Sequence, residues 1–180
     1  MTERPDDELV REVFAHFGLA AYLAQVLERG LVNALTSVYG PEPYRLSQAE
    51  LDQRFEALAE GNPGALPEAL SRAGLSAEVM PVLRRALRDR HRLIHHFFWD
   101  RAAEFMSAEG CHRMLEDLTQ MEERFRDCDA RVEAEIHRWA AGHGITTDDF
   151  DAVRQAMLER GRVLSEVEVG EIMEPRRRAR

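Results

Sequence analysis

The chain has 180 residues, of which 44% are hydrophobic and 32% are charged, and this balance favours one folded domain and excludes a disordered chain. The formal net charge of -9 would repel nucleic acid and anionic membranes, so an anion-binding function would need a local basic patch. The sequence has no apolar run of about 18 residues and no signal-peptide pattern at its charged start, so we expect a cytoplasmic protein with reduced cysteines.

Strong helix formers dominate the composition and apolar residues recur every three or four positions, which predicts an all-α fold. We expect an antiparallel helical bundle of about five or six helices, two of them long and heptad-patterned. The first long helix is expected over residues 6–38. Shorter helices are expected over 47–60 and 67–72, and a longer helical segment over 77–105, in which Pro81 predicts a bend or a late start.

The second long helix is expected over residues 111–141, because its apolar residues again follow heptad spacing. Gly110 is expected to break the helix at its beginning. Both cysteines of the chain, Cys111 and Cys128, fall on this helix. About seventeen residues at a rise of about 1.5 Å separate them by about 25 Å, which excludes a disulfide bond between them.

The end of the chain carries a last helix and a basic tail. The helix is expected over residues 148–160, capped by Thr147 and ended by Gly161. We expect one domain over 1–165 and a flexible basic tail over 166–180.

A strongly basic segment separates two apolar stripes of the helical segment expected over 77–105. It carries five arginines against one aspartate, a local charge of +4 in a chain of net charge -9. The arginines are Arg84, Arg85, Arg88, Arg90 and Arg92. Three of the seven histidines follow closely, at His91, His95 and His96. A local reversal of charge of this kind indicates an anion-binding site.

Histidine and arginine together supply the chemistry of metal-free RNA cleavage. Imidazole can take and give a proton near neutral pH, and guanidinium can hold a phosphate and stabilise the charge that develops on it. One histidine would remove the proton from the ribose 2′-hydroxyl, and a protonated histidine would assist the leaving group.

The run Arg90-His91-Arg92-Leu93-Ile94-His95 resembles the Arg-x4-His signature of the HEPN superfamily, in which a polar residue often follows the arginine. The resemblance implies an all-helical homodimer that brings two Arg/His motifs together across its interface. It also implies a metal-independent endoribonuclease of the toxin–antitoxin, anti-phage or RNA-processing kind. An antitoxin or a nucleotidyltransferase would be its partner, and no cofactor or metal is expected.

The hypothesised roles follow from this resemblance. Arg90 would bind the scissile phosphate, and His95 would act as general base or acid, with His96 as the alternative at the next spacing. His91 would support proton transfer. The substrate-binding residues would be Arg88, Arg92 and Glu28, although Gln25 could take the place of Glu28. On one straight helix Arg90 and His95 lie about 140° apart, so they converge only if the helix bends or a second subunit contributes.

Other interpretations of the same residues remain open. The arginines could form a solvated face, and His95 or His96 could be a core histidine with satisfied hydrogen bonds. His91 and His95 have the spacing of a metal-binding helix, and Glu109 and His112 have the spacing seen in carboxylate-bridged bundles. The chain could also be a catalytically silent helical module that binds a nucleotide in the basic pocket or a protein along its apolar stripe.

Overall fold

The computed structural model describes residues 4–33, 76–142, 144–162, 164 and 168–173. These residues form helices and connections without any β-strand, so the all-α fold class is confirmed for the described chain. The helices expected over 47–60 and 67–72, and the end of the first expected helix, lie outside these residues. The chain separates into two compact units, unit 1 with Met1–Gly30 and Ser76–Val132, and unit 2 with Leu31–Leu75 and Glu133–Arg180.

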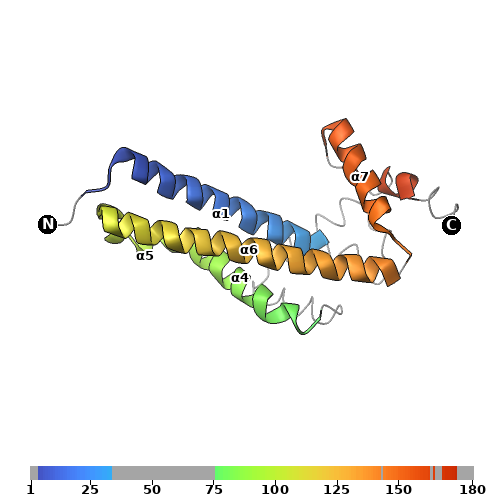
Figure 1. Cartoon of the computed structure of the whole chain (residues 1–180), viewed down its shortest axis with the longest axis horizontal. Coiled ribbons are helices and arrows are strands. Elements are labelled where there is room, and N and C mark those ends of the chain that lie inside the picture. The colour runs from blue at the N-terminus through green and yellow to red at the C-terminus, as the bar shows by residue number, and fades with distance from the viewer. Residues whose placement is uncertain (1–3, 34–75, 143, 163, 165–167, 174–180) are drawn as a thin grey trace. The chain divides into compact units, whose positions relative to one another are not determined.

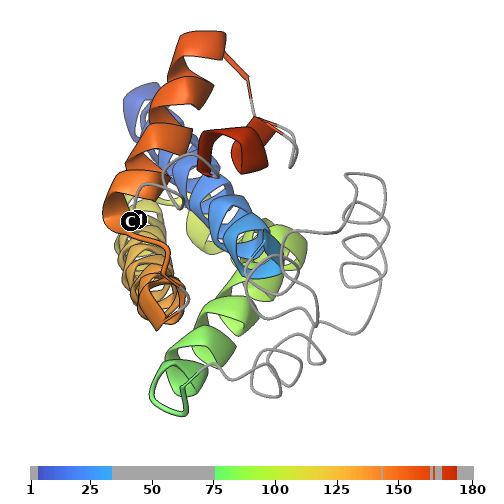
Figure 2. The same cartoon turned by 90° about the vertical axis from the view of Figure 1, so that its right-hand side faces the viewer.

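Unit 1 is a bundle of three long helices, α1 (Asp7–Asn33), α4 (Val79–His95) and α6 (Ala108–Gly142), of which α1 and α6 contribute their residues up to the unit boundary. The one-turn helix α5 (Phe97–Asp100) and the 3-10 helix η2 (Glu104–Met106) connect α4 to α6. Figure 1 shows α1 and α6 side by side and running in the same direction. In the view of Figure 2, α1, α4 and α6 occupy the corners of a triangle.

The direction of α4 follows from its contacts with α1. Arg90 contacts Glu28, whereas Phe98, which lies further along the chain, contacts Phe17, which lies earlier in α1. The helix α4 therefore runs antiparallel to α1. None of the helices that the structure describes has both the length and the apolar character needed to cross a membrane.

The core of unit 1 confirms the heptad patterns expected for the two long helices. Each helix turns one apolar stripe inward, and burial of such a side chain contributes about 1.5–3 kcal/mol. The buried residues are Leu9, Val13, Ala20, Ala24 and Leu27 of α1, Val79, Met80, Leu83, Ala86 and Leu93 of α4, and Cys111, Met114, Leu118, Met121, Phe125, Cys128 and Val132 of α6.

The expected long segment over 77–105 is in fact broken at His96. The helix α4 begins at Val79 with Pro81 in its first turn, which confirms the late start, and ends at His95. His96 has φ -130° and ψ -19°, which interrupts the helical backbone before α5. The expectation of one helical segment up to residue 105 was therefore wrong at this residue.

Gly110 does not break a helix, and this expectation was also wrong. It lies in the first turn of α6, where its N–H donates to the hydroxyl oxygen of Ser107 at 3.1 Å. A Cβ atom at Gly110 would lie 2.0 Å from the carbonyl oxygen of Glu104. Glycine is needed here because it lets the backbone of η2 pack directly on α6.

Unit 2 contains α7 (Thr147–Arg160), whose N-cap is Thr146 and not Thr147 as expected. The Asp149 carboxylate accepts a hydrogen bond from the backbone N–H of Thr146 at 2.8 Å, and the Thr146 side chain accepts one from the backbone N–H of Asp149, which together form a capping box. Gly161 ends the helix with φ 63°, as expected.

Residues 168–173, which the sequence placed in a flexible tail, are helical. Val169 and Met173 are one helical turn apart, and both join an apolar cluster of unit 2, which explains the order. The other members of the cluster are Trp139, Ala140, Ile145, Phe150 and Val153. The remainder of the expected tail lies outside the described residues.

Candidate functional site

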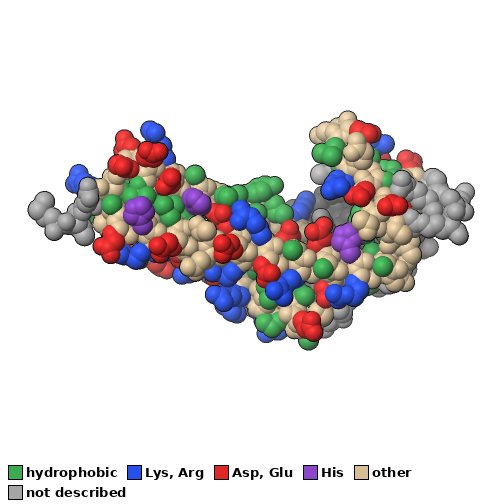
Figure 3. All heavy atoms as spheres, viewed as in Figure 1, with side chains coloured by type: hydrophobic (Ala, Val, Ile, Leu, Met, Phe, Trp, Pro, Cys, Tyr) green, Lys and Arg blue, Asp and Glu red, His purple; other side chains and the backbone are tan. Residues whose placement is uncertain are grey.

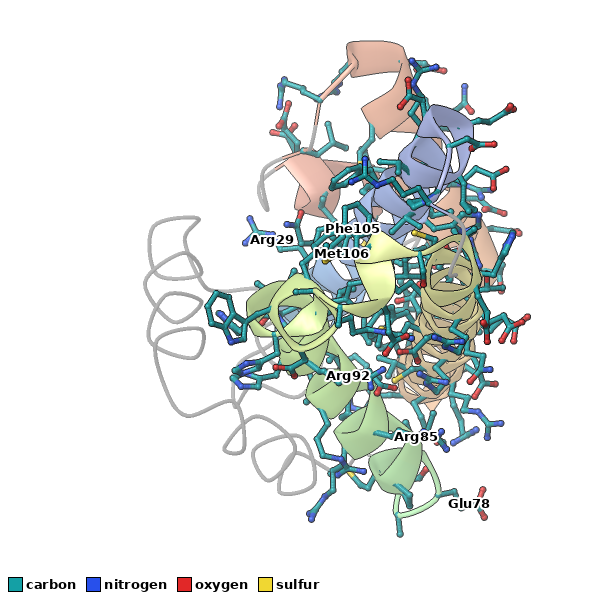
Figure 4. All side chains as sticks on the ribbon, turned by 90° about the vertical axis from the view of Figure 1, so that its left-hand side faces the viewer. Arg29, Glu78, Arg85, Arg92, Phe105 and Met106 are labelled. Atoms are coloured by element: carbon teal, nitrogen blue, oxygen red, sulfur yellow. The ribbon has the colours of Figure 1, made fainter. Side chains whose placement is uncertain are left out.

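The candidate site lies on the exposed face of α4 and at its C-terminal end. Leu83, Ala86 and Leu93 are buried, so residues on the opposite side of the same helix point outward. Five basic or imidazole side chains share this exposed side: Arg84, Arg88, His91, Arg92 and His95. Figure 4 shows Arg85 and Arg92 along α4, with Phe105 and Met106 beyond its end.

The three histidines form one exposed cluster. The ring centroids of His91 and His95 lie 4.9 Å apart, those of His91 and His96 5.3 Å apart, and those of His95 and His96 6.3 Å apart. His91 and His96 are five residues apart and would diverge by about 140° on an unbroken helix. The break at His96 therefore brings its ring back to the other two.

Arg90 lies on a different side of α4 from His95. Its Nη2 atom is 3.1 Å from the Oε2 atom of Glu28 on α1, and the two side chains are only 28% and 26% exposed. Glu28 is thus an ion-pair partner of Arg90. Because α4 stays continuous from Val79 to His95, it does not bend near Arg90. One chain alone therefore does not direct Arg90 and His95 to a common point.

Arg92 is held by an ion-pair network that the sequence did not reveal. The Oδ2 atom of Asp117 on α6 accepts hydrogen bonds from Arg92 and from Arg101, both at 2.6 Å. Arg101 also donates to Glu104 at 2.7 Å, and this hydrogen bond lowers the pKa of the Glu104 carboxyl. The guanidinium of Arg101 lies 5.4 Å from the ring centroid of Phe97. These contacts fix the end of α4 to α6.

The one aspartate of the basic segment forms an ion pair with an arginine of α6. Asp89 accepts a hydrogen bond from Arg124 at 2.6 Å. Within the described part of the chain, Arg84, Arg85 and Arg88 form no ion pair. In contrast, acidic and basic side chains are interspersed on the face of the molecule shown in Figure 3. The exposed side of α4 is therefore a basic surface on an acidic protein.

Aromatic packing anchors the segment that follows the histidines. Phe97 is buried, and Phe98 packs against Phe14 and Phe17 of α1 with ring centroids 5.3 and 4.9 Å apart. Trp99, which directly follows Phe98 in α5, is instead 85% exposed. The sequence reasoning missed Trp99, although its position three residues after His96 was a usable signal.

The alternative of a metal site finds no support in the residues that the structure describes. No group of three or more His, Cys, Asp or Glu side chains among them is placed to hold a metal ion. Glu109 pairs with Arg113 at 2.7 Å. Cys111 and Cys128 are buried and free, and burial raises the pKa of both thiols, that of Cys128 to about 12.

Comparison with known proteins adds no relative: no protein-family model, curated protein or solved structure matches this chain. A functional proposal must therefore depend on the geometry of the histidine cluster and its arginines.

Proposed function

We propose that the chain is a HEPN-like, metal-independent endoribonuclease that acts as a homodimer. The observation that carries the proposal is the exposed cluster of His91, His95 and His96 beside a basic helix face, on a protein whose overall charge is negative. Arginines attract the phosphate backbone, and neighbouring imidazoles can both accept and donate protons. A surface that only needed to be solvated would not require three adjacent imidazoles.

The proposed reaction uses the 2′-hydroxyl of the substrate as nucleophile. His95 removes the proton from this hydroxyl, the oxygen attacks the phosphorus, and the bond from phosphorus to the 5′-oxygen breaks. A protonated histidine, His91 or His96, donates a proton to the departing 5′-oxygen. The products carry a 2′,3′-cyclic phosphate and a 5′-hydroxyl. Exposed Arg88 and Arg92 hold the flanking phosphates.

A second subunit supplies the arginine that acts with His95. Arg90 and His95 lie on different sides of a continuous helix, so a shared phosphate requires Arg90 of one copy and His95 of the other. A guanidinium has five N–H donors, and the contact with Glu28 leaves donors for a phosphate. An antitoxin or nucleotidyltransferase partner remains an expectation from the resemblance alone.

A second candidate function is a catalytically silent module that binds a nucleotide or a protein. The ion pairs of Arg90 with Glu28 and of Arg92 with Asp117 favour this function. Guanidinium groups that already bind carboxylates offer fewer free N–H donors and less uncompensated positive charge to the phosphate of a substrate.

Cleavage of single-stranded RNA in the presence of a chelator tests the first candidate. We expect His95→Ala to reduce the cleavage rate by about 100-fold or more, and mass spectrometry to find a 2′,3′-cyclic phosphate on the product. His112→Ala is the matched control, because His112 is an exposed histidine on α6 outside the cluster. Equal cleavage by His95→Ala and by the control would remove the proposed role of His95.

Mixing two inactive variants tests the division of the site between subunits. In a mixed dimer of Arg90→Ala and His95→Ala, one site keeps both groups and the other loses both. Random pairing should therefore restore about a quarter of the wild-type activity. If each chain formed a complete site by itself, mixing would restore nothing.

A further inference from the structure

Trp99, three residues after His96 in the chain, is exposed in a way that packing does not explain. At 85% it is the most exposed of the large hydrophobic side chains that the structure describes. Tryptophan side chains are on average well buried, so this exposure is unusual. The N–H of Asp100 donates to the carbonyl oxygen of His96 at 2.8 Å, so the chain makes one helical turn here. Trp99 follows His96 by three residues and therefore lies on the same side of that turn.

The exposed indole of Trp99 lies on α5, whose neighbouring residues are fixed, and not on a free chain end. Phe97 is buried, and Phe98 packs against two phenylalanines of α1, so the residues directly before Trp99 are anchored. On the other side, Arg101 is fixed by Asp117 and Glu104. The backbone on both sides of Trp99 is thus tied to unit 1, and the exposed indole is a flat aromatic surface on a fixed backbone.

We propose that Trp99 is a stacking platform for an unpaired base of single-stranded RNA, placed next to the histidines that act on the adjoining phosphate. The inference rests on the proposed function and names its substrate class. A base inside a duplex has both faces stacked on its neighbours, whereas an unpaired base can lay a free face on the indole. The exposed arginines Arg88 and Arg92 complement the phosphate backbone in charge.

Intrinsic fluorescence tests the inference because the chain has only two tryptophans, Trp99 and Trp139. The variant Trp139→Phe leaves Trp99 as the single indole, and a second change, His95→Ala, prevents cleavage during the measurement. We expect a single-stranded oligoribonucleotide to quench the fluorescence of this protein. The same sequence as a perfect duplex, and inorganic phosphate, should leave the fluorescence unchanged.

Binding by variants of Trp99 in the His95→Ala background gives the second measurement, with a labelled oligonucleotide and anisotropy as readout. We expect Trp99→Ala to weaken binding by about tenfold and Trp99→Phe to retain most of it, because phenylalanine also stacks. Met106→Ala is the matched control, since Met106 is a 74% exposed apolar side chain on η2. Circular dichroism of each variant verifies the fold.

Three results would overturn the inference: no quenching by single-stranded RNA, equal quenching by the duplex, or full binding by Trp99→Ala. Loss of the dimer in Trp99→Ala, with RNA binding per site unchanged, would also overturn it and make Trp99 a contact between subunits. Failure of the nuclease proposal is a separate result. A protein with His95 intact that cleaves nothing, yet whose Trp99 is quenched by single strands, would keep the stacking site and lose the catalysis.

Discussion

Replacing Gly110 with alanine probes the close packing of η2 on the first turn of α6. A Cβ atom at this position would lie 2.0 Å from the carbonyl oxygen of Glu104, 2.6 Å from its carbonyl carbon and 2.7 Å from its Cα. An unstrained contact between carbon and oxygen needs about 3.3 Å, so η2 would have to move by more than about 1 Å. All three atoms belong to the backbone, so no rotation of a side chain can relieve the overlap.

The size of the effect follows from these contacts. Overpacking costs about 1–3 kcal/mol, and an obstruction by backbone places this site at the upper end of the range. The same carbonyl oxygen accepts a hydrogen bond from the N–H of Ser107 at 3.1 Å, and its loss costs about 1 kcal/mol. The higher helix propensity of alanine offsets about 1 kcal/mol at most. We expect Gly110→Ala to lower the free energy of unfolding by about 3 kcal/mol.

Urea unfolding at neutral pH, followed by circular dichroism, measures this free energy, and Gly18→Ala is the matched control. Beyond its own stretch of α1, no described atom lies within 4 Å of a Cβ added at Gly18. This substitution gains only helix propensity and should raise the free energy of unfolding by about 0.5–1 kcal/mol. A Gly110→Ala protein as stable as the wild type would refute the described packing of η2 on α6.

Three further predictions concern the cysteines and two carboxylates. Burial raises the pKa of Cys111 and Cys128, so neither thiol should react with a thiol reagent near neutral pH until urea unfolds the protein, and rapid reaction in the folded state would contradict this. Asp117→Ala removes the shared partner of two arginines and should lower the free energy of unfolding by about 1–2 kcal/mol. Arg131→Ala removes an exposed ion pair and should change the free energy of unfolding by less than about 0.5 kcal/mol. Equal effects of the two substitutions in urea unfolding would be evidence against the contact of Asp117 with both arginines. The pKa of Glu104 is lowered by the hydrogen bond from its arginine, so its stabilising contribution is present above the pKa of a free glutamate and is lost as the pH falls. Glu104→Gln should therefore lose less stability than the wild type between about pH 6 and pH 3, and equal losses would contradict the assignment.

The long helices could be predicted from sequence because their buried positions carry apolar residues. The apolar stripes of α1 and α6 recur at helical spacing, and the structure buries them. The break at His96 could not be predicted in this way, since neither glycine nor proline marks it. It accompanies the packing of Phe97 and Phe98 beside α1, which is a contact between distant parts of the chain.

The candidate site shows the same division between local and distant causes. The spacing of His91 and His95 predicted that they share a face, and the 140° separation of Arg90 from His95 followed from helix geometry alone. The bridge formed by Asp117 of α6 could not be predicted, because it joins Arg92 of α4 and Arg101 of the turn after α5, which lie 25 and 16 positions earlier in the chain. Aspartates are common in this chain, and no local pattern distinguishes Asp117, which binds the two arginines, from the others.

The interruption at His96 has a consequence for any attempt to imitate this surface. A synthetic peptide that spans α4 and α5 would lack α1, which holds the two phenylalanines beyond the interruption. Without α1, the peptide would form one continuous helix. The imidazole of His96 would then point away from those of His91 and His95. Antibodies or small-molecule ligands selected for the three rings together should therefore recognise only the folded chain, as a conformational epitope.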